Sequence, residues 1–158
     1  MNTARFFQLS DLFYSDYPAN EFNQILDPKK NGRGYYGVTI IELYNLKFAI
    51  PLHSNINVKK GYKLREDKDT GQISGLDFEK AVILRKDEYI GSDYEVKPSK
   101  DYSTVNKNKN QINKKFKKYI TEYIEAIEKN DQNIIRQRYR NTTLIYFHDL
   151  LIPLNTKQ

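Results

Sequence analysis

The sequence contains no cysteine and no tryptophan. Without cysteine, the chain can form no disulfide bond, no zinc site with thiolate ligands and no thiolate nucleophile. The 158 residues must therefore be stabilised by packing and hydrogen bonding alone. A chain without disulfides suits a reducing compartment, so we expect a cytoplasmic protein.

Long apolar runs are also missing. No stretch approaches the roughly 20 apolar residues that a membrane-spanning helix needs. The first residues, MNTARFFQLSDLFYSD, lack the apolar segment of a signal peptide. We therefore expect a single soluble domain over residues 1–158 that does not contact a membrane.

Several motifs of phosphate and metal chemistry are absent as well. The sequence has no Walker loop, no dinucleotide-binding glycine motif and no HExxH. The acidic residues of 65–71 (REDKDTG) lack the spacing of a calcium loop, and no obvious carboxylate cluster suits two-metal catalysis. We therefore expect no metal site and no cofactor, and any phosphodiester cleavage should use the 2′-OH of RNA.

Positive charge is concentrated in one segment. The chain carries a net charge of +6, and residues 102–121 contain lysines but no acidic residue. Outside this segment the basic and acidic residues balance. The place of the imbalance, more than its size, indicates where an anionic partner would bind. The lysines are Lys107, Lys109, Lys114, Lys115, Lys117 and Lys118.

The first two thirds of the chain have the pattern of β-strands. Residues 35–44 (YYGVTIIELY) are rich in β-branched and aromatic side chains. Residues 46–52 alternate with a period of two, and Tyr44-Asn45 is a suitable tight turn between the two strands. Pro51 should lie at an edge or a strand end, because it donates no backbone hydrogen bond. A central strand is predicted at 81–84, and shorter strands at 6–7, 86–90 and 94–97.

The last third has the pattern of helices. Apolar side chains recur at three- and four-residue steps from Ile112 to Ile127. Residues 142–151 predict a shorter helix that ends before Pro153, with His148 as a packed or surface histidine. We expect an α+β fold: a compact antiparallel β-barrel or sheet with helical additions and a mostly helical C-terminal third. Candidate caps of the longer helix are Ser99, Asp101 and Ser103.

The order of charges on the longer helix is unusual. Lysines in the first turns oppose the helix macrodipole, at a cost of about 0.3–1 kcal/mol per exposed charge. This order is expected of a face that binds phosphates, and a lysine-rich solvated surface is the alternative. The same two interpretations apply to the arginines near Tyr139. The late acidic residues are Glu122, Glu125 and Glu128, and these arginines are Arg136, Arg138 and Arg140.

A polar pair, His53-Ser54, follows the apolar strand of residues 46–52. Metal-independent RNA cleavage needs a base for the 2′-OH proton, cations or hydroxyl donors for the charged phosphate, and an acid for the leaving oxygen. His53 can act as base or acid, because imidazole exchanges protons near neutral pH. Ser54 can donate to a phosphate oxygen, and Lys59 or Arg33 can neutralise it. The alternative is that the pair only opens a turn.

The order of several short motifs resembles the toxins of type III toxin–antitoxin systems, the ToxN/AbiQ family, and is most similar to its CptN-like members. The similarity covers residues 5–84, and the helical part only in pattern. The most specific motif is 47–54 (KFAIPLHS). The other motifs are 5–10 (RFFQLS), 36–42 (YGVTIIE) and 75–84 (GLDFEKAVIL).

The resemblance implies a fold similar to the MazF/Kid barrel toxins and an endoribonuclease that cuts single-stranded, A-rich RNA to 2′,3′-cyclic phosphate and 5′-hydroxyl ends. It also implies an RNA antitoxin as partner. In this family the toxin cuts a tandem-repeat transcript into pseudoknotted units, which inhibit it within a closed protein–RNA assembly. Released toxin halts growth, often as abortive-infection defence against phage.

The resemblance also assigns candidate site residues. ToxN-like toxins have a Thr-Ser pair after Pro-Leu, with a lysine soon after. Ser54 retains the serine, His53 takes the threonine position, and Lys59 is the first available cation, because Ile56 stands near the position of the lysine. We therefore expect Ser54, His53 and Lys59 to be catalytic. The expected RNA contacts are Arg5, Arg33, Tyr35, Tyr36, Lys60, Tyr62, Lys63, Lys107, Lys114, Lys115 and Lys118.

Two other functions fit parts of this pattern. A non-catalytic RNA-binding module on a similar barrel explains the lysines and the many aromatic residues equally well. Expression alone should arrest growth if the protein is a nuclease, and should not if it only binds RNA. A barrel toxin that poisons a protein target is the third hypothesis, and its target binding should lack the steep salt dependence of phosphate contacts.

Overall fold

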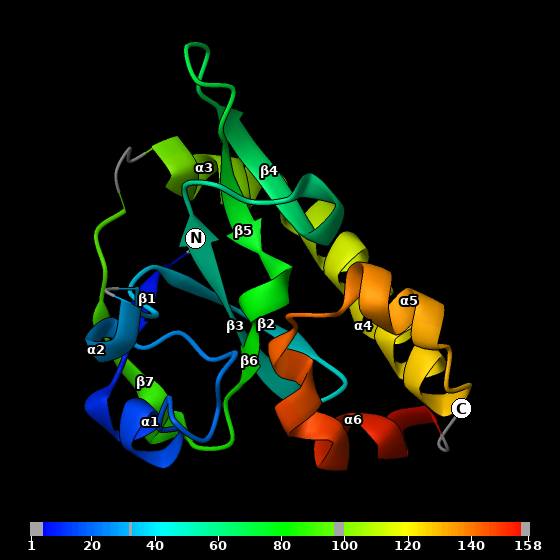
Figure 1. The fold of residues 1–158 in the computed structure, drawn as a ribbon. Helices are drawn as coiled ribbons and strands as arrows, with labels where there is room; N and C mark the ends of the chain where they lie inside the picture. Colours follow the sequence, from blue (N-terminus) through cyan, green and yellow to red (C-terminus); the bar gives the residue numbers. More distant parts are fainter. Residues whose placement is uncertain (1–4, 32, 97–99, 156–158) are drawn as a thin grey trace.

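The computed structural model describes residues 5–31, 33–96 and 100–155 (Figure 1). Its centre is an open antiparallel sheet with the strand order β4-β5-β3-β2-β1-β7, and β6 pairs with β3 beside this path. The predicted α+β fold with an antiparallel sheet and a helical C-terminal part is confirmed. The strands are β1 (Phe7–Leu9), β2 (Val38–Leu43), β3 (Leu46–His53), β4 (Gly61–Glu66), β5 (Ile73–Asp77), β6 (Val82–Ile83) and β7 (Ile90–Asp93).

The helices α4 and α5 lie along one side of the sheet, and α1 and α2 lie near its β1–β7 end (Figure 1). Within the described residues, no helix is both long and apolar enough to cross a membrane. The helices are α1 (Asp11–Asp16), α2 (Pro28–Asn31), α3 (Lys100–Lys107), α4 (Lys109–Glu128), α5 (Gln132–Arg138) and α6 (His148–Asn155). Short 3-10 helices are η1 (Val58–Lys60), η2 (Phe78–Lys80), η3 (Asp87–Tyr89) and η4 (Thr143–Phe147).

The predicted hairpin of β2 and β3 is confirmed. Its turn consists of Tyr44 and Asn45, which both have positive φ, 56° and 62°. Two successive residues with positive φ match the right-handed twist of the flanking strands, which is why such turns close hairpins. The pairing continues from Leu43 opposite Leu46 to Val38 opposite Pro51. The hairpin pairing ends two residues before His53, the last residue of β3.

The prediction that Pro51 lies at an edge or strand end is wrong, because Pro51 is buried within β3 and pairs with Val38. Leu52 donates its backbone N–H to Gly37 on the β2 side, so the nitrogen of Pro51 faces the opposite side of β3. There β6 pairs with residues 48–49 and β5 with residues 52–53. Pro51 lies between these two pairings, where a missing donor costs little.

The shorter strands differ from the prediction. The apolar run 81–84 forms only the two-residue β6, which pairs with β3 and lies beside the main order. The segment predicted as a strand at 86–90 begins as the 3-10 helix η3, and β7 follows it as an edge strand paired with β1. Residues 94–96 form no strand, and Lys97 lies outside the described residues.

The long helix α4 packs on the sheet through the predicted apolar stripe. Ile112, Phe116 and Ile120 are buried, and the ring of Phe116 packs edge-on against Phe48 of β3 and Phe78 of η2. Burying a large side chain of this kind contributes about 1.5–3 kcal/mol. This contact fixes α4 against the face of β3, whose end carries His53.

The start of this helical region also differs from the prediction. A separate helix, α3, precedes α4, and Ser103 donates its hydroxyl to the Lys100 carbonyl inside α3. The Asp101 carboxylate faces Arg65 of β4 instead of capping a helix. Ser99, the remaining candidate cap, lies outside the described residues. An ion pair with a neighbouring strand has therefore replaced the expected local cap.

The C-terminal segment begins with the 3-10 helix η4 and continues into α6. Thr142 caps η4 by accepting the Leu144 N–H. The prediction that this helix ends before Pro153 is wrong, since Pro153 lies inside α6. His148 is half-buried and bonds Tyr123 of α4 at 2.6 Å, as expected of a packed histidine. This bond joins α6 to α4.

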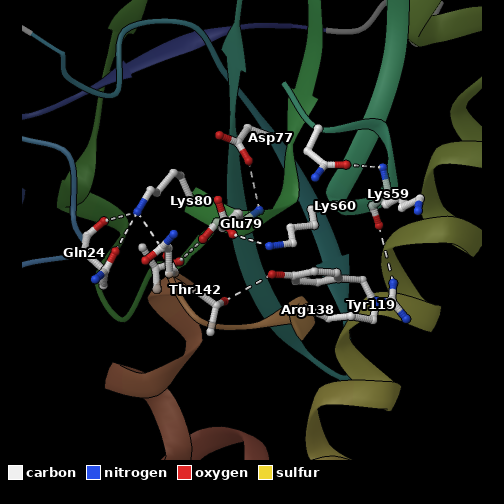
Figure 2. A network of polar contacts seen from close by, with 12 residues as sticks. Gln24, Lys59, Lys60, Asp77, Glu79, Lys80, Tyr119, Arg138 and Thr142 are labelled. Atoms are coloured by element: carbon white, nitrogen blue, oxygen red, sulfur yellow. Dashed lines mark hydrogen bonds and ion pairs between the residues drawn. The ribbon is translucent and has the colours of Figure 1, made fainter. Parts of the chain in front are cut away.

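A polar network fastens the C-terminal segment to the sheet (Figure 2). The Lys80 ammonium group donates to the Gln24 carbonyl, the Gln24 side-chain oxygen and the Asn141 carbonyl, each at 3.0 Å. Burial lowers the pKa of Lys80. Lys60 forms an ion pair with Glu79 at 3.3 Å in the same region. Lys80 therefore holds together three segments that are distant in the sequence, around Gln24, Lys80 and Asn141.

Candidate functional site

A hollow of about 680 Å³ lies beside the end of β3. Its walls are the end of β3, Arg65 near the end of β4, Ser74 and Gly75 of β5, residues 33–34, 36–37 and 94–96, and Asp101 of α3. We call it the His53 hollow, because His53 and Ser54 line it together. The sheet register places His53 opposite Gly75. A Cβ atom at Gly75 would collide with the Tyr62 carbonyl, so close strand packing requires glycine there.

The central feature of the hollow is a pair formed by His53 and Asp77. The His53 Nδ1 and Asp77 Oδ2 atoms lie 2.7 Å apart, and the two side chains are only 10% and 16% exposed. The other Asp77 oxygen accepts the Glu79 backbone N–H at 3.0 Å (Figure 2). Because an ionised carboxylate can only accept hydrogen bonds, it holds the His53 proton on Nδ1. The Nε2 atom of neutral His53 therefore carries a lone pair.

The Nε2 atom of His53 is buried and has no hydrogen-bond partner among the described residues. Leaving a buried polar atom unpaired costs about 1–3 kcal/mol, and such atoms are rare in folded proteins. The opposite side of the same ring is held firmly by Asp77. The Tyr35 hydroxyl and the Arg65 Nε atom are likewise buried without a hydrogen-bond partner among the described residues, so it is the bond to Asp77 that sets His53 apart.

Guanidinium groups provide the positive charge in the hollow. Arg65 of β4 lies 3.4 Å from Asp101, whose side chain is 5% exposed. The Arg65 Nε atom is the nitrogen nearest to Asp101, and it is buried without forming a hydrogen bond within the described residues. Arg33 is exposed and lines the same hollow.

A hydroxyl group and two aromatic rings complete the lining. Ser54 is exposed, and its carbonyl accepts the Ser74 hydroxyl at 3.2 Å. Tyr36 and Tyr94 stand at the rim with ring centroids 6.5 Å apart and planes inclined by 27°. The hollow therefore combines an imidazole, a hydroxyl group, two guanidinium groups, the carboxylates of Glu95 and Asp101, and two aromatic rings.

Four of the residues expected from the sequence meet in this hollow: His53, Ser54, Arg33 and Tyr36. Tyr35 does not line it, because its ring is fully buried and packs against Phe13. A ring enclosed by the core cannot contact RNA while the core is intact.

Lys59, expected to be catalytic, does not line the hollow. It lies on η1, where its carbonyl accepts from Arg138 of α5 (Figure 2). Lys60 is mostly buried in its ion pair with Glu79. The Lys and Arg side chains that line the hollow among the described residues are Arg33 and Arg65.

The other expected RNA contacts are spread over the surface. Tyr62 donates to Gln111 of α4, and Lys63 pairs with Glu66. Arg5 forms a two-point ion pair with Asp93. These side chains already have protein partners, and none of them lines the His53 hollow.

The lysines of α3 and α4 do not line the hollow either. Lys107 and Lys114 are exposed. Lys118 is also exposed and lies 3.9 Å from Glu122. Lys115 donates to the Val58 carbonyl at 2.8 Å, and partial burial lowers its pKa. A role of these lysines in RNA binding stays a prediction, and it would require RNA to extend from the hollow onto the helices.

Sequence reasoning missed Asp77, Arg65, Asp101 and Tyr94 as candidate site residues. Asp77 lies inside the motif at 75–84 that carries part of the family resemblance. That motif could have pointed to Asp77. The pairing of Asp77 with His53, however, depends on the register between β3 and β5. In the described part of the chain, no group of three or more His, Asp or Glu side chains is placed to hold a metal ion. No family model, curated protein or solved structure matches the chain.

Proposed function

We propose that the protein is an endoribonuclease that cleaves single-stranded RNA by attack of the 2′-OH. The observation that carries this proposal is the His53–Asp77 pair, with His53 Nε2 buried and unpaired beside a hollow that Ser54 and Arg65 also line. A histidine that only fills space in the core gains nothing from a carboxylate partner on one nitrogen and an unsatisfied second nitrogen.

The proposed reaction needs one proton acceptor and charge stabilisation. His53 Nε2 takes the 2′-OH proton as the bond between O2′ and phosphorus forms. Asp77 holds the ring in the required tautomer and stabilises the imidazolium that results. The bond between phosphorus and O5′ then breaks, O5′ takes up a proton from water, and the imidazolium returns its proton to the solvent. The products are a 2′,3′-cyclic phosphate and a 5′-hydroxyl.

The negative charge of the pentacovalent phosphate is stabilised by groups in the same hollow. Arg65, anchored by Asp101, offers a guanidinium group that is oriented before RNA binds. Arg33 and the Ser54 hydroxyl supply further donors. In this assignment, Arg65 performs the role that the family resemblance gave to Lys59. Donors fixed in advance are the most effective, because they need no reorganisation during the reaction.

The wider role follows from the resemblance to type III toxins. We propose that the protein is a toxin of the ToxN/AbiQ kind, acts in the cytoplasm and halts growth in defence against phage. Its inhibitor would be a processed tandem-repeat RNA, bound in a closed protein–RNA assembly. The open sheet would then be an elaborated form of the MazF/Kid architecture. The support is the position of the motif 47–54, which ends at the His53 hollow.

Cleavage of a short, A-rich single-stranded RNA in EDTA tests the proposal. We expect the purified protein to cut it and to leave cyclic phosphate ends, identified by mass spectrometry. The same RNA with 2′-deoxy substitution at the cut site should remain intact. Cleavage of the deoxy-substituted RNA, or absence of any cleavage, would contradict the 2′-OH mechanism. RNA binding without cleavage would instead favour the non-catalytic RNA-binding module.

The antitoxin proposal has a separate test. Expression of the protein alone should arrest growth, and co-expression of the transcript encoded immediately upstream should restore it. That upstream DNA should contain a short tandem repeat followed by a terminator. Growth arrest that the transcript does not relieve would contradict the RNA-antitoxin part of the proposal.

A further inference from the structure

Two exposed aromatic rings stand together at the rim of the His53 hollow. Tyr36 is 41% exposed and Tyr94 is 38% exposed. No other aromatic side chain in the described part of the chain is as exposed as these two. Most of the other rings are buried or pack against the core. These two rings are therefore the aromatic surface of the described residues that a flat ligand can reach most readily.

The backbone holds both rings in place. Tyr94 donates its N–H to the Phe6 carbonyl at 2.9 Å, and its carbonyl accepts the Tyr102 hydroxyl at 2.8 Å. The Tyr102 hydroxyl also accepts the Val96 N–H at 2.8 Å. These bonds fix the chain on both sides of the Tyr94 side chain. Tyr102, on α3, is therefore a positioning residue for this ring.

Tyr36 is held in a similar way by its two neighbours. Tyr35 donates its N–H to the Tyr14 hydroxyl at 2.7 Å, and the Gly37 carbonyl accepts from Leu52 at 2.8 Å. The Tyr94 ring lies 3.4 Å from the place where a Gly37 Cβ would be, so a side chain there would press against it. Hydrogen bonds thus hold the backbone that carries the two exposed rings, which lowers the entropic cost of binding a flat ligand.

The position of the pair matches the course of a nucleotide chain. On one side lies the His53 hollow with its phosphate-binding groups. On the other side Tyr36 also borders a second hollow of about 1000 Å³. Its polar lining includes the neutral side chains of Gln8, Ser10 and Ser92 and the charged side chains of Asp11, Asp27 and Lys29. An RNA strand with its phosphate beside His53 would pass over the rings, where a base would meet an aromatic face.

We propose that Tyr36 and Tyr94 form a stacking platform for one unpaired base next to the cleaved phosphate. The platform deepens the proposed function and rests on it, because it names the substrate as RNA with an unstacked base at this place. Every base offers a flat π-face, so stacking selects unpaired bases and tolerates different sequences. A base inside a duplex is stacked on its neighbours and cannot offer that face.

The test uses an A-rich single-stranded RNA that carries 2′-O-methyl groups and one 2-aminopurine. The methyl groups prevent attack by the 2′ oxygen, so binding is measured without cleavage. With the fluorescent base moved along the strand, we expect quenching at one position next to the cut site. Tyr36→Leu and Tyr94→Leu should abolish that quenching and weaken binding about 5- to 150-fold, as for removal of a stacking ring. Tyr36→Phe and Tyr94→Phe should behave as the wild type.

The controls separate this inference from the nuclease proposal. Equal losses in the Leu and Phe variants would overturn the platform, because the hydroxyl and not the ring would then matter. Equal quenching by the duplex form of the RNA would overturn it too. Normal cleavage by both Leu variants would overturn the platform and leave the nuclease intact. Ring-dependent quenching by a protein that cuts no RNA would support the platform and contradict the nuclease. Tyr102→Phe should reduce quenching while the fold stays intact.

Discussion

Among the single residues of the site, Asp77 determines which nitrogen of His53 can accept a proton. We predict that Asp77→Asn lowers the cleavage rate about 10²- to 10⁴-fold, the range found when a histidine base loses its tautomer or is removed. The Asn amide would donate to Nδ1, and the proton would then reside on Nε2. RNA affinity should change little, because Asp77 does not face the phosphate groups of the proposal. Single-turnover cleavage and a binding isotherm check both statements.

Asp69→Asn is the matched control for this change. Asp69 is exposed in the turn between β4 and β5 and lies outside the His53 hollow. Both substitutions remove one negative charge, so a general charge effect would appear in both variants. A cleavage rate for Asp77→Asn equal to that of the control would remove Asp77 from the proposed mechanism.

Only part of this site could be predicted from single residues. His53 and Ser54 follow a strand directly, so their place at a strand end could be recognised. Asp77 lies 24 residues from His53, and the two meet because β3 pairs with β5 in one particular register. A single sequence does not specify that register. Lys59 illustrates the opposite error: its nearness in sequence suggested nearness in space, but η1 carries it towards α5.

Among the elements, the docking of α6 on α4 should depend on pH. His148 of α6 bonds Tyr123 of α4, and burial lowers the pKa of His148 below its ordinary value of 6.5. Between the lowered pKa and 6.5, the unfolded chain binds more protons than the folded chain. We therefore predict that the contribution of His148 to the free energy of unfolding is complete above pH 6.5. This contribution falls as the pH drops from 6.5 towards the lowered pKa.

Urea unfolding of the wild type and of His148→Gln at a series of pH values measures this effect. Gln can still bond Tyr123, but it has no proton to gain. The variant should therefore lack the part of the acid sensitivity that lies just below pH 6.5. Parallel pH profiles of the two proteins would show that His148 does not contribute. The carboxylates with lowered pKa values, Asp16, Asp67 and Asp149, titrate below 3.8 and do not overlap this window.

Elements with strong local signals were predicted well. The hairpin of β2 and β3 has its turn at Tyr44-Asn45, and the apolar stripe of α4 is buried as expected. Errors arose where tertiary pairing decides the outcome. Pro51 is tolerated inside β3 because two other strands leave a gap beside it, and β6 is short because it pairs only with residues 48–49. The local sequence pattern gives no information on the gap beside Pro51 or on the length of β6.

For the whole molecule, the charge distribution gives a prediction about RNA length. The lysines of α3 and α4 lie outside the His53 hollow, so only an RNA that extends beyond the site can reach them. We predict that replacing Lys107, Lys114 and Lys118 by Ala lowers the salt dependence of binding by about one unit of log–log slope for each phosphate that is no longer neutralised. Cleavage at saturating RNA should be unchanged.

Titration of a long and a short RNA over a series of salt concentrations checks this statement. The short RNA, which fills only the hollow, should give the same slope with wild type and variant. If the slope for the long RNA also stays the same, the lysines form a solvated surface and the charge argument from the sequence fails.

The overall architecture was predictable only to its class. Alternating and helical patterns indicated an antiparallel sheet followed by helices, as found. The strand order β4-β5-β3-β2-β1-β7 arises from non-local pairings, and β1 joins β7 across more than half of the chain. No periodicity reports such a pairing. The same pairing brings segment 94–96 to the hollow, which is why Tyr94 was missed.

The most direct measurement compares the two histidines in the same assay. Single-turnover cleavage of one A-rich RNA in EDTA is measured for the wild type, His53→Asn and His148→Gln, together with the affinity of each for the uncleavable form. The account predicts a loss of about 10²-fold or more for His53→Asn at unchanged affinity, and wild-type cleavage by folded His148→Gln. Wild-type cleavage by His53→Asn would contradict it.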